Sequence, residues 1–152
     1  MLPDVPLHPL LVHAAVVLIP VTALAVVLWV VLPRFRAWLD WGLPVIGVAS
    51  GLIAWFTVQF GRELAEGVTQ TPILDEHFLW GARVQWLGPL LGLAAVLLWL
   101  VSSPRTRWSK RTGVLGAAWL RIGIMVLSVV LAAATVLAVI LAGDSGATSV
   151  WG

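Results

Sequence analysis

The sequence predicts an all-α integral membrane protein, a bundle of four transmembrane helices with both termini on the extracytoplasmic side. This prediction rests on the composition and on the length of the apolar stretches. Of the 152 residues, 61% are hydrophobic and only 11% are charged, whereas about 25% of the residues of a soluble domain are charged. Four apolar stretches account for the difference, and each has the length of about 20 residues that a bilayer-spanning helix requires.

Short polar segments join these stretches, so we expect a single transmembrane domain over residues 1–152. The expected spans are 10–32, 42–60, 77–101 and 114–142. Pro9 and Pro33 mark the limits of the first span, because proline suits the first turn of a helix and cannot continue one. We expect the fourth span to end in the segment 143–146, and we find no clear internal repeat among the four spans.

Basic residues collect in the first and third connections between the spans. They are Arg34, Arg36, Arg105, Arg107, Lys110 and Arg111. The positive-inside rule places both connections in the cytoplasm and therefore places the termini and the connection 61–76 outside. Tryptophan is enriched at the headgroup layer, and we expect Trp38, Trp41, Trp108 and Trp119 near the inner surface and Trp80 and Trp151 near the outer one. These features predict a multi-pass protein of the bacterial cytoplasmic membrane.

The composition also excludes several classes of site. The chain has no cysteine, which removes disulfides, thiolate zinc sites, iron–sulfur clusters and covalent c-type haem attachment. The net charge is +2, and no basic face with interleaved aromatic residues is present. We therefore expect the basic loops to meet lipid headgroups rather than nucleic acid.

The predicted topology brings all three histidines to the outer surface. They are His8, His13 and His77, and the carboxylates of the same layer include Glu63, Glu76 and Asp144. Such groups at the edge of an apolar bundle are costly unless they face a partner, water, a metal or a cofactor. Arg83 lies about 9 Å deeper than His77 along the same helix, and we expect it to bind Glu76, Glu63, Asp144 or the propionate of a haem.

Four interpretations of this layer remain open. Haem b is the first, with His13 and His77 as iron ligands and Arg83 at a propionate. The second is a divalent transition metal held by histidines and carboxylates, namely His8, His13, His77, Glu63, Glu76 and Asp144. A proton or quinone site is the third. The fourth is a hydrogen-bond network that ties the helix ends together and binds no cofactor. Elsewhere, the pairs Gly47/Gly51 and Gly88/Gly92 have the GxxxG spacing typical of close helix packing.

Three segments carry a resemblance to a known family. They are the opening Pro6-Leu7-His8-Pro9-Leu10-Leu11-Val12-His13, the central Asp75-Glu76-His77 and the closing segments 143–147 and 150–152. The chain resembles, over essentially its whole length, the bacterial four-helix membrane family catalogued as domain-of-unknown-function family 2231. The resemblance implies haem or metal binding by His8, His13 and His77. Many members have histidine in place of Asp144, and a carboxylate suits a metal better than a haem iron.

We therefore expect a histidine/carboxylate site at the outer surface that binds haem b or a metal and acts in electron transfer. The alternative is an accessory or structural subunit of a larger membrane complex, for example a respiratory one, with no cofactor of its own. The expected partners are the lipid bilayer and either subunits of a membrane complex or further copies of the chain. No residue is assigned a catalytic role, and whether the protein is an enzyme stays open.

Overall fold

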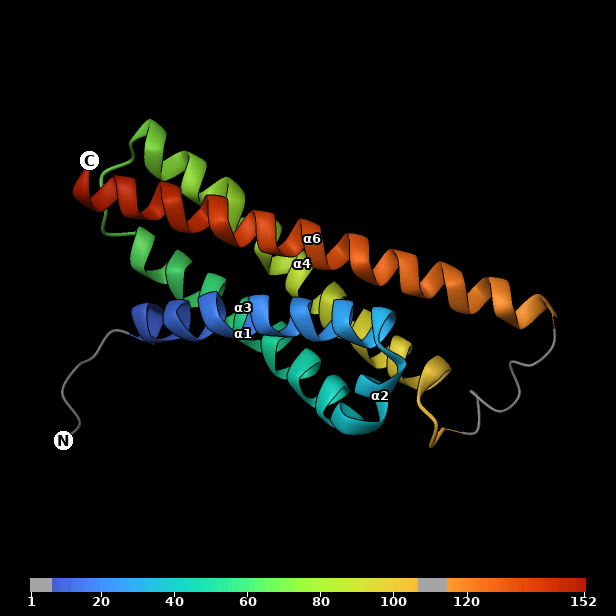
Figure 1. Cartoon of the computed structure of the whole chain (residues 1–152). Helices are drawn as coiled ribbons and strands as arrows, with labels where there is room; N and C mark the ends of the chain where they lie inside the picture. Colours follow the sequence, from blue (N-terminus) through green and yellow to red (C-terminus); the bar gives the residue numbers. More distant parts are fainter. Residues whose placement is uncertain (1–6, 107–114) are drawn as a thin grey trace, which may run out of the picture.

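The computed structural model describes residues 7–106 and 115–152. Its helices are α1 (Leu7–Val31), α2 (Pro33–Leu39), α3 (Gly42–Ala65), α4 (Pro72–Ser102) and α6 (Leu115–Trp151) (Figure 1). Four of them, α1, α3, α4 and α6, are long and apolar enough to cross a membrane. No β-strand occurs in the described ranges, which confirms the predicted class of an all-α membrane bundle. Arg107, Trp108, Lys110, Arg111 and the predicted start of the fourth span lie outside the described residues.

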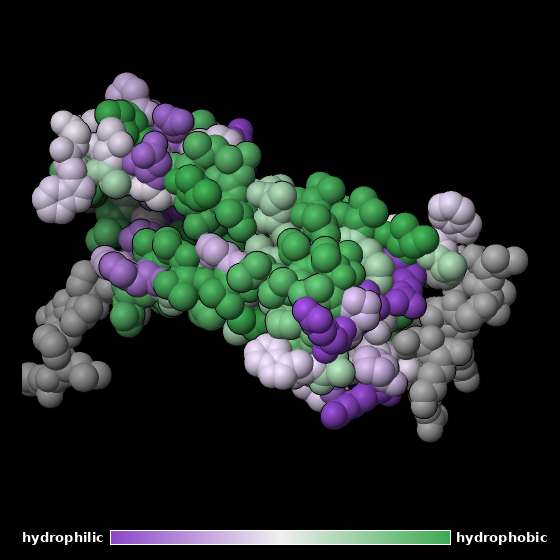
Figure 2. Space-filling view, in the orientation of Figure 1, coloured by the Kyte–Doolittle hydropathy of each residue, from purple (hydrophilic) through white to green (hydrophobic). Residues whose placement is uncertain are grey.

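The four long helices form an antiparallel ring. Helix α1 packs against α3 and α6, α4 packs against the same two helices, and α1 and α4 lie diagonally opposite with few contacts. The starts of α1 and α4 and the ends of α3 and α6 therefore share one end of the bundle, called here the histidine end (Figure 1). The opposite end, which contains α2 and the start of α6, is called the basic end. Hydrophilic side chains gather at both ends, and an apolar band separates them (Figure 2).

Close approach of α3 and α4 at glycine holds the centre of the bundle together. A Cβ atom added at Gly92 would lie 2.5 Å from the carbonyl oxygen of Gly47, and one added at Gly51 would lie 3.1 Å from the Cα of Pro89. The two GxxxG segments thus pack against each other. The sequence predicted close helix approach at each segment but not that the two segments are partners. Small residues matter here because lipid tails are as apolar as leucine, so membrane helices associate through close packing rather than through the hydrophobic effect.

Several helix boundaries differ from those that the sequence predicts. Helix α1 begins at Leu7 rather than at residue 10, and α3 ends at Ala65 rather than at residue 60. Helix α4 begins at Pro72, where Thr71 caps it by accepting a hydrogen bond from the backbone N–H of Leu74 at 3.2 Å. Helix α6 does not end in the segment 143–146 but continues to Trp151. The prediction of a helix end was wrong because glycine is common inside membrane helices, and Gly146 has a packing role that is described below.

Candidate functional site

His8 lies in the first turn of α1 and binds the neighbouring helix α3. Its half-buried ring places Nδ1 2.9 Å from the carbonyl oxygen of Thr57. A Cβ atom at Gly61 would lie 2.8 Å from Cε1 of the His8 ring. The imidazole therefore occupies the space that a side chain at position 61 would take.

His77 repeats this arrangement between α4 and α6. Its half-buried ring places Nδ1 2.8 Å from the carbonyl oxygen of Ala142, and a Cβ atom at Gly146 would lie 2.9 Å from the same nitrogen. In both contacts the glycine follows the residue that provides the carbonyl by four positions. The helix pairs α1–α3 and α4–α6 thus present the same motif of histidine, carbonyl and glycine.

A proline at the same offset extends the correspondence between the two helix pairs. Pro20 lies 12 residues after His8 in α1, and Pro89 lies 12 residues after His77 in α4. The similarity is hard to see in the sequence, because only a few positions match and the connections within the two pairs differ in length. The structure reveals it by bringing each glycine against its histidine.

His13 has a different environment from the other two histidines. Its side chain is exposed, and Nδ1 lies 2.7 Å from the carbonyl oxygen of Pro9, four residues earlier in the same helix. The described hydrogen bond of His13 therefore stays within α1, whereas those of His8 and His77 each join two helices.

All three hydrogen bonds show which ring nitrogen of the imidazole is the donor. A carbonyl oxygen only accepts hydrogen bonds, so Nδ1 is the donor in each case. In the neutral ring, Nε2 then carries the lone pair. Metal-ligating histidines usually have this arrangement, in which one ring N–H is donated to a carbonyl or carboxylate and the other nitrogen binds the metal. In His8, His13 and His77, Nε2 is therefore the ring nitrogen that can bind a metal.

The structure does not gather the predicted site residues into one cluster. His8 lies between α1 and α3, whereas His77 lies between α4 and α6. The side chains of Glu63, Glu76 and Asp144 are exposed. Within residues 7–106 and 115–152, no group of three or more histidine, aspartate or glutamate side chains is arranged to hold a metal ion.

Two arginines of the histidine end have partners that the sequence analysis did not predict. The guanidinium of Arg83 lies 3.9 Å from the centroid of the Trp80 ring, a cation–π contact, and it pairs with no carboxylate of the described chain. Arg62 Nη2 donates to Oε1 of the buried Gln85 at 2.7 Å and so links α3 to α4. The sequence does contain one signal of this link, because Gln85 is a polar residue inside a long apolar stretch.

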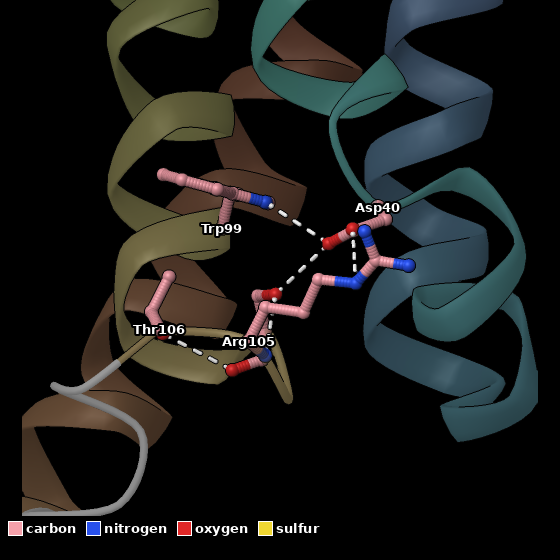
Figure 3. A network of polar contacts seen from close by, with 5 residues as sticks. Asp40, Trp99, Arg105 and Thr106 are labelled. Atoms are coloured by element: carbon pink, nitrogen blue, oxygen red, sulfur yellow. Dashed lines mark hydrogen bonds and ion pairs between the residues drawn. The ribbon is translucent and has the colours of Figure 1, made fainter.

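A further polar cluster lies at the basic end, centred on Asp40 (Figure 3). Asp40 follows α2 with a φ of 33° and is only 6% exposed. Its Oδ1 accepts hydrogen bonds from Trp99 Nε1 at 3.3 Å and from Ser103 Oγ at 3.0 Å. Its Oδ2 lies 3.0 Å from Arg105 Nε, an ion pair without the alignment of a hydrogen bond. The cluster joins the turn between α2 and α3 to the end of α4.

These contacts explain how a carboxylate is tolerated at a buried position. Burial of an unpaired charge is costly, and hydrogen bonds together with an opposite charge offset that cost. The sequence shows Asp40 as the only acid near the predicted inner surface, and the basic Arg105 in the other arginine-rich connection was the available clue to its partner. Trp99 and Ser103 are the donors because of the rotation of α4 about its axis, and the sequence pattern does not predict that rotation.

Fold and site together define a four-helix integral membrane bundle. In it, the helix pairs α1–α3 and α4–α6 each contain a histidine that packs against a glycine. The family described as "Predicted membrane protein (DUF2231)" matches residues 4–152, and the chain belongs to this family. Comparisons with curated proteins and with solved structures gave no significant match.

Proposed function

We propose that the protein binds haem b through histidines of the histidine end and transfers electrons in the bacterial cytoplasmic membrane. One observation carries the proposal. His8, His13 and His77 each donate Nδ1–H to a backbone carbonyl, which leaves Nε2 of each neutral ring as a lone-pair donor. Arg34, Arg36 and Arg105 lie at the basic end, so the positive-inside rule supports an orientation with the histidine end and both termini outside.

The histidine end supplies imidazoles and a cation of the kinds that a haem requires, on the diagonally opposite helices α1 and α4. His13 and His77 would hold the iron, and His8 is a further donor because its ring is held in the same way as that of His77. Arg83 is exposed and stacked on Trp80, so its N–H groups are available to a propionate. The bound haem would supply one-electron transfer. Because His13 is exposed, an iron that it holds can also be reached by a second copy of the chain or by another subunit.

A divalent transition metal is the alternative cofactor, with Glu63, Glu76 and Asp144 as carboxylate donors beside the histidines. No three-donor group is assembled within the described ranges, so this version requires donors from a second copy or a partner. The carboxylates are exposed and are therefore accessible to such a neighbour.

The competing function is that of an accessory subunit of a larger membrane complex, with no cofactor of its own. The hydrogen bonds from His8 to α3 and from His77 to α6 support it, because each joins two helices. In this interpretation His8 and His77 hold the helices together at the histidine end, and their Nε2 atoms bind no metal.

Substitution of histidine by asparagine separates the two functions. The asparagine amide can replace the Nδ1–H donor, but it lacks a nitrogen equivalent to Nε2. Reduced-minus-oxidised absorption spectra are recorded first on membranes that contain the overproduced protein and then on the purified protein, together with metal analysis. We expect a b-type haem signal that His77→Asn abolishes while the thermal unfolding temperature is kept.

The accessory function predicts a different result for the same samples. Membranes and purified protein would then show neither haem nor stoichiometric metal, and His77→Asn would resemble the wild type in every assay. That result would overturn the proposed cofactor. His77→Ala serves as the matched variant, because it removes both the Nδ1–H donor and Nε2.

A further inference from the structure

An apolar groove runs along the bundle surface near the basic end, between the last turn of α1 and the first half of α6. Its volume is about 380 Å³, within the range of roughly 300–1,000 Å³ that ligand pockets occupy. The side chains that line it are Val30, Ile122, Met125, Val126, Val129 and Val130. No lining residue is polar, so the part of a ligand that enters the groove must be hydrocarbon.

Two arginines, Arg36 and Arg121, lie next to residues that line this groove. Arg36 donates from Nε to the carbonyl oxygen of Trp29 at 2.8 Å and from Nη2 to that of Val30 at 3.1 Å. Its guanidinium is thereby fixed against the last turn of α1, next to a residue that lines the groove. Arg121 directly precedes Ile122, which lines the groove from the α6 side.

The two guanidinium groups are close enough to repel each other. Burial lowers the pKa of Arg36, and the nearby charge of Arg121 lowers it further. In the described ranges the ion-paired carboxylate is that of Asp40, and its partner is Arg105 rather than Arg36 or Arg121. A ligand with a phosphate would relieve this repulsion, because guanidinium groups bind phosphate through paired, charge-assisted hydrogen bonds.

We propose that this groove binds one anionic phospholipid, with the headgroup phosphate at Arg36 and Arg121 and an acyl chain along the valines of α1 and α6. Charge complementarity selects the lipid class. A zwitterionic lipid brings its own cation to a position that already contains two, whereas an anionic lipid does not. The apolar lining selects a lipid over a free phosphate, which has nothing to place in the groove.

The charge requirement is tested by native mass spectrometry of the detergent-solubilised protein, titrated with phosphatidylglycerol or with phosphatidylcholine of the same acyl chains. We expect a one-to-one complex that favours phosphatidylglycerol. Arg121→Gln should lower that affinity roughly fivefold, which corresponds to about 1 kcal/mol for one basic group at an anionic surface. Arg121 is chosen because Arg36 also binds the end of α1. The matched control is Arg34→Gln, since Arg34 is an exposed cation of the same helix α2 that makes no described contact with the groove.

The acyl requirement is tested by filling the groove. Val126→Trp should weaken phosphatidylglycerol binding, whereas Leu127→Trp should not, because Leu127 is exposed at the next position and does not line the groove. Glycerol phosphate, which has the headgroup charge without an acyl chain, should not compete. Equal binding of both lipids, an equal loss in Arg34→Gln and Arg121→Gln, or a lipid-free dimer that excludes phosphatidylglycerol would each overturn the proposal.

Discussion

Replacement of Gly92 by alanine tests the packing of α3 against α4 most directly. The added Cβ would lie 2.5 Å from the carbonyl oxygen and 3.1 Å from the carbonyl carbon of Gly47. Both are backbone atoms of α3, so no side-chain rotation can relieve the contact. The two helices must separate, and the neighbouring contact between Gly51 and Pro89 must loosen with them.

Two opposing effects set the size of the change in stability. Overpacking of a close interface costs about 1–3 kcal/mol, while alanine is favoured over glycine inside a helix by about 1 kcal/mol. We therefore expect Gly92→Ala to lower the free energy of unfolding by up to about 2 kcal/mol, the cost of overpacking less the gain in helix propensity. Gly47→Ala should act in the same direction, because its Cβ would lie 2.7 Å from that of Ala95.

The assay is reversible unfolding in mixed micelles of mild and denaturing detergent, followed by tryptophan fluorescence. Gly123→Ala is the matched control, because a Cβ at that position in α6 would have no atom of another described helix within 4 Å. The control should be as stable as the wild type or more stable, since only the helix propensity changes. If Gly92→Ala proved as stable as Gly123→Ala, the close contact between α3 and α4 would be refuted.

Two further substitutions test the polar clusters at the two ends of the bundle. Gly146→Ala should displace the His77 ring and weaken its hydrogen bond to Ala142, with a loss of about 1 kcal/mol. Gly143→Ala, where a Cβ meets no atom within 4 Å, should not, and the ¹⁵N shifts of the His77 ring distinguish the two variants. Asp40→Ala should cost about 2–3 kcal/mol because it leaves buried donors of Trp99 and Ser103 without an acceptor. Asp40→Asn should cost less, and equal unfolding midpoints for the two variants would contradict this account of the cluster.

Much of the fold could be predicted because the signals that define it are local. An apolar stretch of bilayer length must form a helix, since a helix satisfies the backbone hydrogen bonds within the stretch itself where no water is available. The spacing of Gly47 with Gly51 and of Gly88 with Gly92 marked the close contact in the same way. Glycine was misleading at Gly146, because the same residue that favours a helix end in water also allows a neighbouring ring to pack against a membrane helix.

The candidate site could be predicted only in part. The alternating direction of the helices brings the starts of α1 and α4 to the same end of the bundle, and this follows from counting spans. It does not follow that His8 faces α3, that His77 faces α6, or that the His13 ring returns to its own helix. Those contacts depend on the rotation of each helix about its axis and on the neighbour that it meets.

The sequence by itself thus determined the class of the protein, the number of its spans and the membership of the histidines in one layer, because hydropathy and length act along the chain. The tertiary structure alone decided that Arg83 stacks on Trp80 and that Asp40 accepts hydrogen bonds from Trp99 and Ser103. It also decided that Arg36 donates to the carbonyl oxygens of Trp29 and Val30. The physical reason is that a polar side chain in a membrane bundle is satisfied by whichever group the packing brings within hydrogen-bond distance. That group can lie far away in the sequence, as Ala142 does from His77.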